Sequence, residues 1–286
     1  PYPAFPFSTI ANISDQGVAH YNGLQVKAET RNARHGIYAL IGYTYSRTYD
    51  NGFTDGLGSS IGAPYYPVPN WSKLDWALSQ INLNNNFTAS VIYDLPFGKN
   101  KRYGNNWNSA ENMILGNWQL TLIQHISSGF PVFVVNSFNQ SGVNFENNGN
   151  SLNRPNQVSD PNKAGPVSAN PGCAAPSKVR TLTNWFNPCA FMAAPAGQLG
   201  NASRTPLSGP DFVNTDFSAI KQFMLPWEGV GLNFRAEFFN LFNHAQFGLP
   251  ATGSTGYADI NTTNFGSISS TVNNPRVIQF GLKLTF

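Results

Sequence analysis

The sequence predicts an all-β protein in which antiparallel transmembrane strands form a segment of a β-barrel and are joined by long extracellular loops. Three observations support this prediction. Only 11% of the residues are charged, against about 25% in an average soluble domain, whereas Asn (36), Gly (26) and Pro (20) are abundant. Alternation of apolar and polar residues with a period of two recurs along the chain. The segments between these stretches alternate between short and long, as in outer-membrane barrels.

The first two expected strands form a hairpin. In residues 24–29, Leu24, Val26 and Ala28 alternate with polar residues, and a tight polar turn follows at residues 31–35. Residues 37–46 then alternate in the same way. Because a period of two places successive side chains on opposite faces of a strand, each stretch is typical of a half-buried strand.

Two further strands are expected in the middle of the chain. Residues 87–95 alternate and end in a turn at residues 96–98. In residues 118–126, the apolar residues Trp118, Leu120 and Leu122 alternate with polar residues, which include His125. These patterns predict a third and a fourth strand, each about as long as a tilted strand that crosses a bilayer.

The last three expected strands follow a long aperiodic region. Residues 128–210 show no sustained period and are rich in Asn, Gly, Pro and Ser. Such a stretch would be unusual in a compact soluble domain, but long extracellular loops are common in outer-membrane barrels. Alternation returns at residues 214–219, 232–238 and 278–286, so the total is seven strands.

Loop lengths predict the orientation of these strands. If the C-terminus lies in the periplasm, the turns at residues 31–35, 96–116 and 224–231 are periplasmic. The long loops at residues 47–84, 128–211 and 241–275 then lie outside the cell. Complete bacterial barrels have an even number of strands and start in the periplasm. An odd number that starts outside predicts that residues 1–286 are the C-terminal part of a larger barrel, which would form an open curved sheet if isolated.

The ends of the chain and its aromatic residues fit this arrangement. The sequence begins Pro1-Tyr2-Pro3, without Met or the features of a signal peptide, so we expect a cleaved leader or a longer parent protein. Several aromatic residues map to strand ends, where they would form two girdles; the alternative is that they are ordinary core residues. Those near periplasmic ends are Tyr93, Trp118, Trp227 and Phe286, and those near outer ends are Tyr43, Tyr45 and Phe87.

The two cysteines, Cys173 and Cys189, both lie in the long aperiodic region. No nearby His or second Cys pair completes a zinc site. A loop disulfide in an oxidising compartment is the first interpretation, and two free thiols are the alternative.

Charged residues in the late strands are expected to face the lumen of the barrel, where charges are tolerated. Arg235 and Glu237 alternate with apolar residues, and we expect them to pair with neighbours such as Asp216 or Lys283. A role for these charges in substrate binding is the sharper hypothesis, and a structural role is the simpler one.

Several other function classes are disfavoured. A net charge of +3 without a basic cluster does not indicate nucleic acid as a partner. The longest strongly apolar stretch, residues 36–43, is too short for a membrane-spanning helix. The four His lie on separate elements, with no zinc-protease or serine-hydrolase motif. The sequence therefore predicts no catalysis, no metal and no cofactor.

Several motifs carry a resemblance to a known family. They are Trp118-Gln119-Leu120, Ser127-Ser128-Gly129-Phe130-Pro131, Trp185-Phe186-Asn187-Pro188, Arg235-Ala236-Glu237-Phe238-Phe239-Asn240-Leu241-Phe242-Asn243-His244 and Phe280-Gly281-Leu282-Lys283-Leu284-Thr285-Phe286. From Tyr21 to its end, the chain resembles the C-terminal β-barrel of Oar-like TonB-dependent transporters. The resemblance implies a barrel of about 22 strands, with a plug domain and a TonB box that this chain lacks. Many relatives carry a charged Asp-Arg-Arg-His-Arg run where this chain has Asn82-Leu83-Asn84-Asn85-Asn86.

The last strand is also similar to the assembly signal of outer-membrane barrels. Its pattern is a polar residue, a Gly, an apolar residue and a terminal aromatic residue, here Gln279, Gly281, Leu284 and Phe286. A strand with a continuous apolar face and a terminal ring at the periplasmic interface can pair with an assembly machine through its edge.

These observations lead to one functional hypothesis and one alternative. The hypothesis is a piece of a TonB-dependent transporter in the outer membrane of a Gram-negative type of cell. Its partners would be membrane lipid, the barrel assembly machinery, TonB through the absent plug region, and an unidentified transported ligand. Because alternation alone does not separate a barrel from a sandwich, the alternative is a secreted β-sandwich that binds carbohydrate with its loop aromatics.

Overall fold

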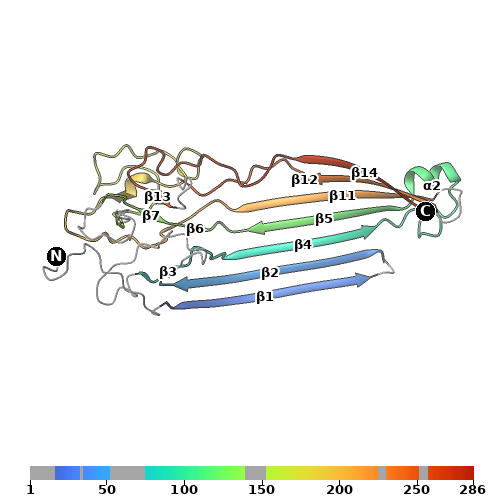
Figure 1. Cartoon of the computed structure of the whole chain (residues 1–286), viewed down its shortest axis with the longest axis horizontal. Coiled ribbons are helices and arrows are strands. Elements are labelled where there is room, and N and C mark those ends of the chain that lie inside the picture. The colour runs from blue at the N-terminus through green and yellow to red at the C-terminus, as the bar shows by residue number, and fades with distance from the viewer. Residues whose placement is uncertain (1–16, 33–34, 52–74, 139–152, 225–229, 251–256) are drawn as a thin grey trace, which may run out of the picture.

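The protein is built on one large antiparallel sheet. The computed structural model describes residues 17–32, 35–51, 75–138, 153–224, 230–250 and 257–286. The long strands lie in chain order across the sheet (Figure 1). They are β1 (Ala19–Asn32), β2 (Ile37–Asp50), β4 (Asn85–Asp94), β5 (Trp118–Ser127), β11 (Phe212–Met224), β12 (Gly231–Phe239) and β14 (Val277–Thr285). The seven expected strands and their antiparallel order are therefore confirmed.

The sheet is open, with β1 and β14 as the outermost strands of its order. A two-residue strand, β3 (Ala77–Leu78), pairs with the end of β2 and is the eighth member of the sheet. No helix among the described residues is long and apolar enough to span a membrane.

The register gives the sheet one apolar and one polar face. A single row across five strands contains only apolar side chains: Val91, Leu122, Phe217, Phe238 and Ile278. A nearby row that points the other way is polar across β5, β11, β12 and β14, with Thr121, Ser218, Glu237 and Gln279, and continues on β4 with Ile92. Since a shift of one residue would exchange the two faces, the pattern of the sequence specifies this register strongly.

The two ends of the sheet differ. At one end, which we call the turn end, the strands are joined by residues 33–36, 95–117 and 225–230. The first of these turns ends at Gly36, whose φ of +68° favours glycine, and a Cβ there would lie 2.6 Å from the carbonyl oxygen of Asp94.

The connection of residues 95–117 contains the helix α2 (Ser109–Leu115), where only a turn is expected from the sequence. A capping box starts it: the Asn108 side chain accepts a hydrogen bond from the Glu111 backbone N–H, and the Glu111 carboxylate accepts one from the Asn108 backbone N–H. Figure 1 shows α2 at the turn end, close to the C-terminus.

At the opposite end, the long connections fold into a compact region that we call the cap, comprising residues 130–138, 153–210 and 246–272 where described. The long aperiodic region expected at residues 128–210 thus forms short elements and a core where the structure describes it. Its short elements are β6 (Pro131–Val132), β7 (Val134–Val135), β8 (Asn156–Gln157), η2 (Pro188–Ala190), β9 (Phe191–Met192), β10 (Leu207–Ser208) and β13 (Ala258–Asp259). Its core is formed by Val132, Val134, Phe186, Ala190, Phe191, Ala202, Leu207 and Ala258.

Buried polar contacts fix the cap to the outer ends of the strands. Arg204 forms an ion pair with Asp50, the last residue of β2, and its Nη2 also donates a hydrogen bond to the Asp50 carbonyl oxygen at 2.9 Å. The Thr205 hydroxyl donates to the carbonyl oxygen of Leu78 in β3 at 2.7 Å. A second buried ion pair joins Arg154 to Asp75. These contacts position the cap over the end of the sheet.

Candidate functional site

The polar face of the sheet carries the four charged residues that the sequence predicts for the lumen. They lie on one face because β11, β12 and β14 are in register, with Ser218 opposite Glu237, Gly281 opposite Arg235, and Lys283 opposite Asn233. Asp216 is on this face as well, two residues from Ser218. The four charges therefore share a surface, and their orientation towards a lumen stays a prediction.

The pairing of these charges differs from the expectation. Arg235 Nη1 lies 3.4 Å from Glu237 Oε1, so the two residues pair with each other. The Asp216 carboxylate instead accepts hydrogen bonds from the Asn214 side-chain amide at 3.0 Å and from the Asn240 backbone N–H at 2.8 Å. Residues two apart on a strand point to the same face, which brings Arg235 and Glu237 together without a cross-strand partner.

Asparagines of residues 82–86 lie at the outer ends of the strands. The Asn82 side chain accepts a hydrogen bond from the Thr48 backbone N–H at 2.7 Å and donates one to Asn84 Oδ1 at 3.0 Å. Next to them, Asn86 Oδ1 lies 3.1 Å from His125 Nε2. These neutral amides give the polar face hydrogen-bonding groups without net charge, and His125 is one member of that polar network.

Large apolar side chains are exposed on the apolar face of the sheet. Phe280 and Leu282 of β14 are 67% and 69% exposed. The aromatic residues expected at strand ends lie on this face: Phe87 is opposite Tyr43 towards the cap, and Tyr93 is opposite Ile37 towards the turn end. Trp227 lies outside the described residues. Such a face matches the apolar band of a barrel that meets lipid.

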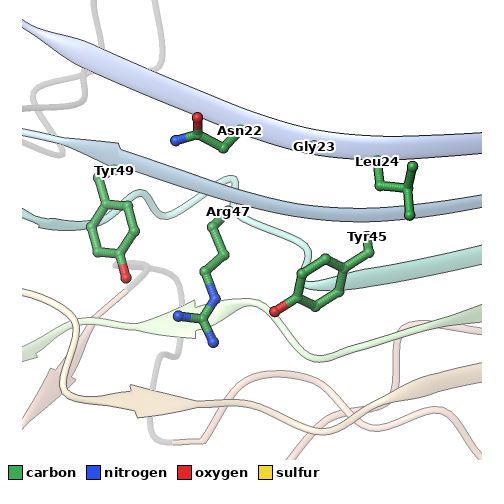
Figure 2. A pocket seen from close by; sticks show the side chains of 6 residues that line it. All are labelled: Asn22, Gly23, Leu24, Tyr45, Arg47 and Tyr49. Carbon is green, nitrogen blue, oxygen red and sulfur yellow. The ribbon is translucent and has the colours of Figure 1, made fainter.

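An open notch of about 270 Å³ lies on the outer part of the apolar face (Figure 2). Figure 2 shows Arg47 between Tyr45 and Tyr49, and the register places these three side chains on one face of β2. The remaining lining residues, all from β1, are Asn22, Gly23 and Leu24. Tyr49 also stacks on Trp76, with ring centroids 6.2 Å apart. The notch thus places the exposed cation of Arg47 between two tyrosine rings.

Cys173 and Cys189 form a disulfide in the cap, with a Cα–Cα distance of 5.6 Å. Cys189 belongs to η2, which begins with a cap at Asn187, whose side chain accepts a hydrogen bond from the Cys189 backbone N–H at 3.1 Å. Its carbonyl oxygen accepts a hydrogen bond from the Asn170 side chain at 3.3 Å. The bridge thereby links the half-buried Cys173 to the core of the cap, in which Cys189 is fully buried.

Titratable groups add one electrostatic feature to the cap. The Asn162 backbone N–H donates a hydrogen bond to the Asp160 carboxylate at 2.9 Å, and this bond holds the pKa of Asp160 below its ordinary value of 3.8. Within the described part of the chain, no group of three His, Cys, Asp or Glu side chains could hold a metal ion.

Two structural features have no counterpart among the expectations from the sequence, namely α2 and the core of the cap. The helix has a readable signal, since Asn108 is followed three positions later by Glu111 and then by the apolar residues 113–115. The cap has no such signal, because its core residues are scattered among Asn, Gly, Pro and Ser over more than a hundred positions.

Comparisons with known proteins identify the family. A family model described as outer membrane beta barrel domain matches residues 1–279. Neither a curated protein nor a solved structure gives a match. The open antiparallel sheet agrees with the family, whereas a β-sandwich would need two facing sheets of long strands, so the secreted sandwich is not supported. The chain belongs to the outer membrane beta barrel domain family, and its place is the outer membrane.

Proposed function

We propose that residues 1–286 are the C-terminal portion of an Oar-like, TonB-dependent transporter and form part of its pore wall and extracellular surface. The wall would be completed by further strands, to about 22 in all. In this proposal the chain performs no catalysis. Its partners are membrane lipid, the barrel assembly machinery, a transported ligand and, through a plug region, TonB.

The observation that carries the proposal is the openness of the sheet. β1 and β14 are the outermost strands, and each has membrane-spanning length. In hydrocarbon, an unpaired backbone group costs several kcal/mol, so both edges require partner strands. An open sheet of seven membrane strands therefore supports a larger closed barrel, and it also leaves β14 accessible to an assembly partner.

The step from barrel to TonB-dependent transporter depends on the resemblance of particular residues. These are the segment 235–244 and the C-terminal strand with Gln279, Gly281, Leu284 and Phe286. In the structure, β12 ends at Phe239 and the chain turns at Asn240 and Asn243, which both have positive φ. The motif thus ends a strand on the polar face, where Asn240 binds Asp216.

Two experiments test separate parts of this proposal. Reconstitution of the 286 residues alone should give no heat-modifiable, protease-resistant monomer; such a monomer would refute the larger barrel. In cells, the complete protein of the gene should form a cross-link with TonB that disappears from a strain without TonB. Absence of any TonB-dependent product would overturn the transporter assignment while leaving the membership of the barrel family intact.

A further inference from the structure

The connection between β4 and β5 is far more elaborate than a simple turn. Residues 95–117 contain α2 and a β-bridge between Phe97 and Tyr103. The Phe97 ring contacts the rings of Tyr103 and Trp107, with centroids 5.8 and 6.4 Å away. Gly104, with a φ of +84°, allows the chain to pass so closely that a Cβ there would lie 2.5 Å from the Trp107 ring. We call this ordered segment, residues 95–117, the foot.

The foot is fastened to the apolar face rather than to the polar face. The indole N–H of Trp118 donates a hydrogen bond to the Ile114 carbonyl oxygen at 3.0 Å. The Lys221 ammonium donates to the carbonyl oxygens of Gly116 and Asn112. Lys221 lies opposite Trp118 and Phe234 in the register, hence on the apolar face. Donors from that face thus reach the Ile114 carbonyl in the last turn of α2 and the carbonyl of its C-cap, Gly116, and the Asn112 carbonyl also accepts the backbone N–H of Gly116.

The fastening also explains how a lysine is accommodated on a face that meets lipid. Lys221 is 1% exposed, and its Nζ lies 5.6 Å from the centre of the Trp118 ring. A cation at the C-terminal end of a helix interacts favourably with the carbonyl dipoles there. The foot therefore covers a charge that would otherwise face the membrane, and α2 is held at the border of the apolar band.

The exposed side of α2 is apolar over its C-terminal half. Met113, Ile114 and Leu115 are all more than half exposed, and Ile114 reaches 68%. The Ile114 backbone is hydrogen-bonded to Trp118 of the apolar face, so this part of α2 lies next to that face at its turn end. A short helix with outward apolar side chains next to a lipid-facing band is suited to lie in a membrane interface.

The same segment carries positive charge. Lys99, Lys101 and Arg102 are exposed, and among the described residues none of them takes part in an ion pair. The one acidic residue of the foot, Glu111, is engaged in the capping box. Three cations against one carboxylate leave a net charge of +2 in residues 95–117. Juxtamembrane cations of this kind attract anionic lipid headgroups.

We propose that the foot binds anionic phospholipid of the periplasmic leaflet. Met113, Ile114 and Leu115 enter the boundary of the acyl chains, and Lys99, Lys101 and Arg102 contact headgroup phosphates. The foot lies at the same end of the sheet as the two short connections between β1 and β2 and between β11 and β12, and outer-membrane barrels have their short connections on the periplasmic side. The continuity of its apolar residues with the lipid-facing sheet favours lipid over a protein partner. The proposal depends on the outer-membrane location and is independent of TonB-dependent transport.

The depth of α2 can be measured in the complete protein of the gene, purified from outer membranes and reconstituted in lipid. A fluorophore is attached to Ile114→Cys or, as the matched control on the same helix, to Ser109→Cys; the parent protein supplies the background. Nitroxide on the acyl chain should quench the label at 114 strongly and the label at 109 weakly. Equal, weak quenching at both positions would overturn the proposal.

The headgroup is tested with nitroxide carried by phosphatidylglycerol or, at the same fraction, by phosphatidylcholine. The anionic carrier should be enriched around the label at 114, roughly fivefold for each cation that meets a phosphate at low salt. The exposed triple variant Lys99→Gln, Lys101→Gln, Arg102→Gln should lose this preference and keep the acyl-chain quenching. Equal quenching by both carriers in the parent sequence would overturn the assignment to anionic lipid.

Discussion

The sheet and the cap use the same kinds of apolar residue in opposite ways. In the sheet, Phe280 and Leu282 are more than two-thirds exposed, whereas in the cap Phe186 and Val132 have no exposure. The cap follows the rule for proteins in water, where rings such as Phe186, Phe191 and Phe265 pack edge to face. The sheet exposes its apolar side chains because the lipid chains of the membrane surround them with an apolar environment. Apolar side chains of the cap are therefore buried within the protein, whereas those of the sheet are exposed to lipid.

The charged groups divide in the same manner. In the cap, Arg204 and Arg154 are buried in ion pairs with Asp50 and Asp75. In the sheet, the pair of Arg235 and Glu237 lies on the exposed polar face, and Lys221 is accommodated only beneath α2. Substitutions at matched positions should therefore separate the two regions.

The largest effect is expected in the core of the cap. Phe186→Ala removes a fully buried ring that contacts Phe191 and Phe265, and should lower the free energy of unfolding of the cap by about 3–5 kcal/mol. Phe280→Ala removes the same ring from the apolar face of the sheet, where lipid chains can fill the space. Hydrogen exchange of cap amides measures the effect of Phe186→Ala, and heat-modifiability of the complete barrel measures the effect of Phe280→Ala. Similar losses of stability in both variants would contradict the proposed difference between the cap and the sheet.

The next largest effect is expected when arginine is placed on either face of β4. Val91 and Ser90 are neighbours in β4 but point to opposite faces, Val91 to the apolar face beside Leu122 and Ser90 to the other face beside Ile123. Val91→Arg should destabilise the barrel by about 2–4 kcal/mol if it lies near the bilayer midplane, and Ser90→Arg should cost much less. Urea titration in lipid vesicles measures both changes. Equal damage on both faces would contradict the lipid-facing assignment.

The disulfide gives an effect of similar size that is confined to the cap. Cys173 and Cys189 are separated by 16 positions, and closing a loop of this length stabilises by about 3 kcal/mol in the chain-entropy model. Reduction should thus loosen the cap, seen as faster hydrogen exchange, and leave the sheet unchanged. On intact cells, thiol reagents should label the protein only after reduction; quantitative labelling without reduction would rule out the bridge.

The sheet could be predicted from the sequence because each strand encodes its faces locally. Residues 87–95 were expected as a strand and β4 is Asn85–Asp94; residues 278–286 were expected and β14 is Val277–Thr285. Alternation with a period of two needs no knowledge of distant residues. For the same reason, alternation assigns each charged residue to a face of the sheet but does not identify its partner. The predicted pairing of Arg235 with Asp216 is accordingly wrong.

The cap could not be predicted because its contacts are distant in sequence. Val132 pairs with Leu207, and Val134 pairs with Ala258. Two-residue strands leave no readable period, and their neighbours are turn-forming residues. The helix α2 is an intermediate case: the capping box of Asn108 and Glu111 is visible in the sequence, but seven residues are too few for a helical period to stand out.

The smallest expected effect is a dependence of cap stability on pH. The Asp160 carboxylate is exposed and accepts hydrogen bonds from the backbone and side chain of Asn162, with Lys163 at 3.9 Å. The hydrogen bond from the Asn162 backbone is the main cause of its lowered pKa. Because the folded pKa lies below the ordinary value of 3.8, the contribution of this carboxylate is present above that value and is lost as the pH falls through the folded pKa. Hydrogen exchange at residues 160–163, measured from about pH 5 to about pH 2, should show this loss in the parent protein and not in Asp160→Asn, whose side chain does not titrate. The same pH profile in both proteins would show that Asp160 does not couple protonation to the structure of the cap. A change that instead reached the amides of β4 or β5 would show that the cap and the sheet do not unfold separately, contrary to the division between the two regions.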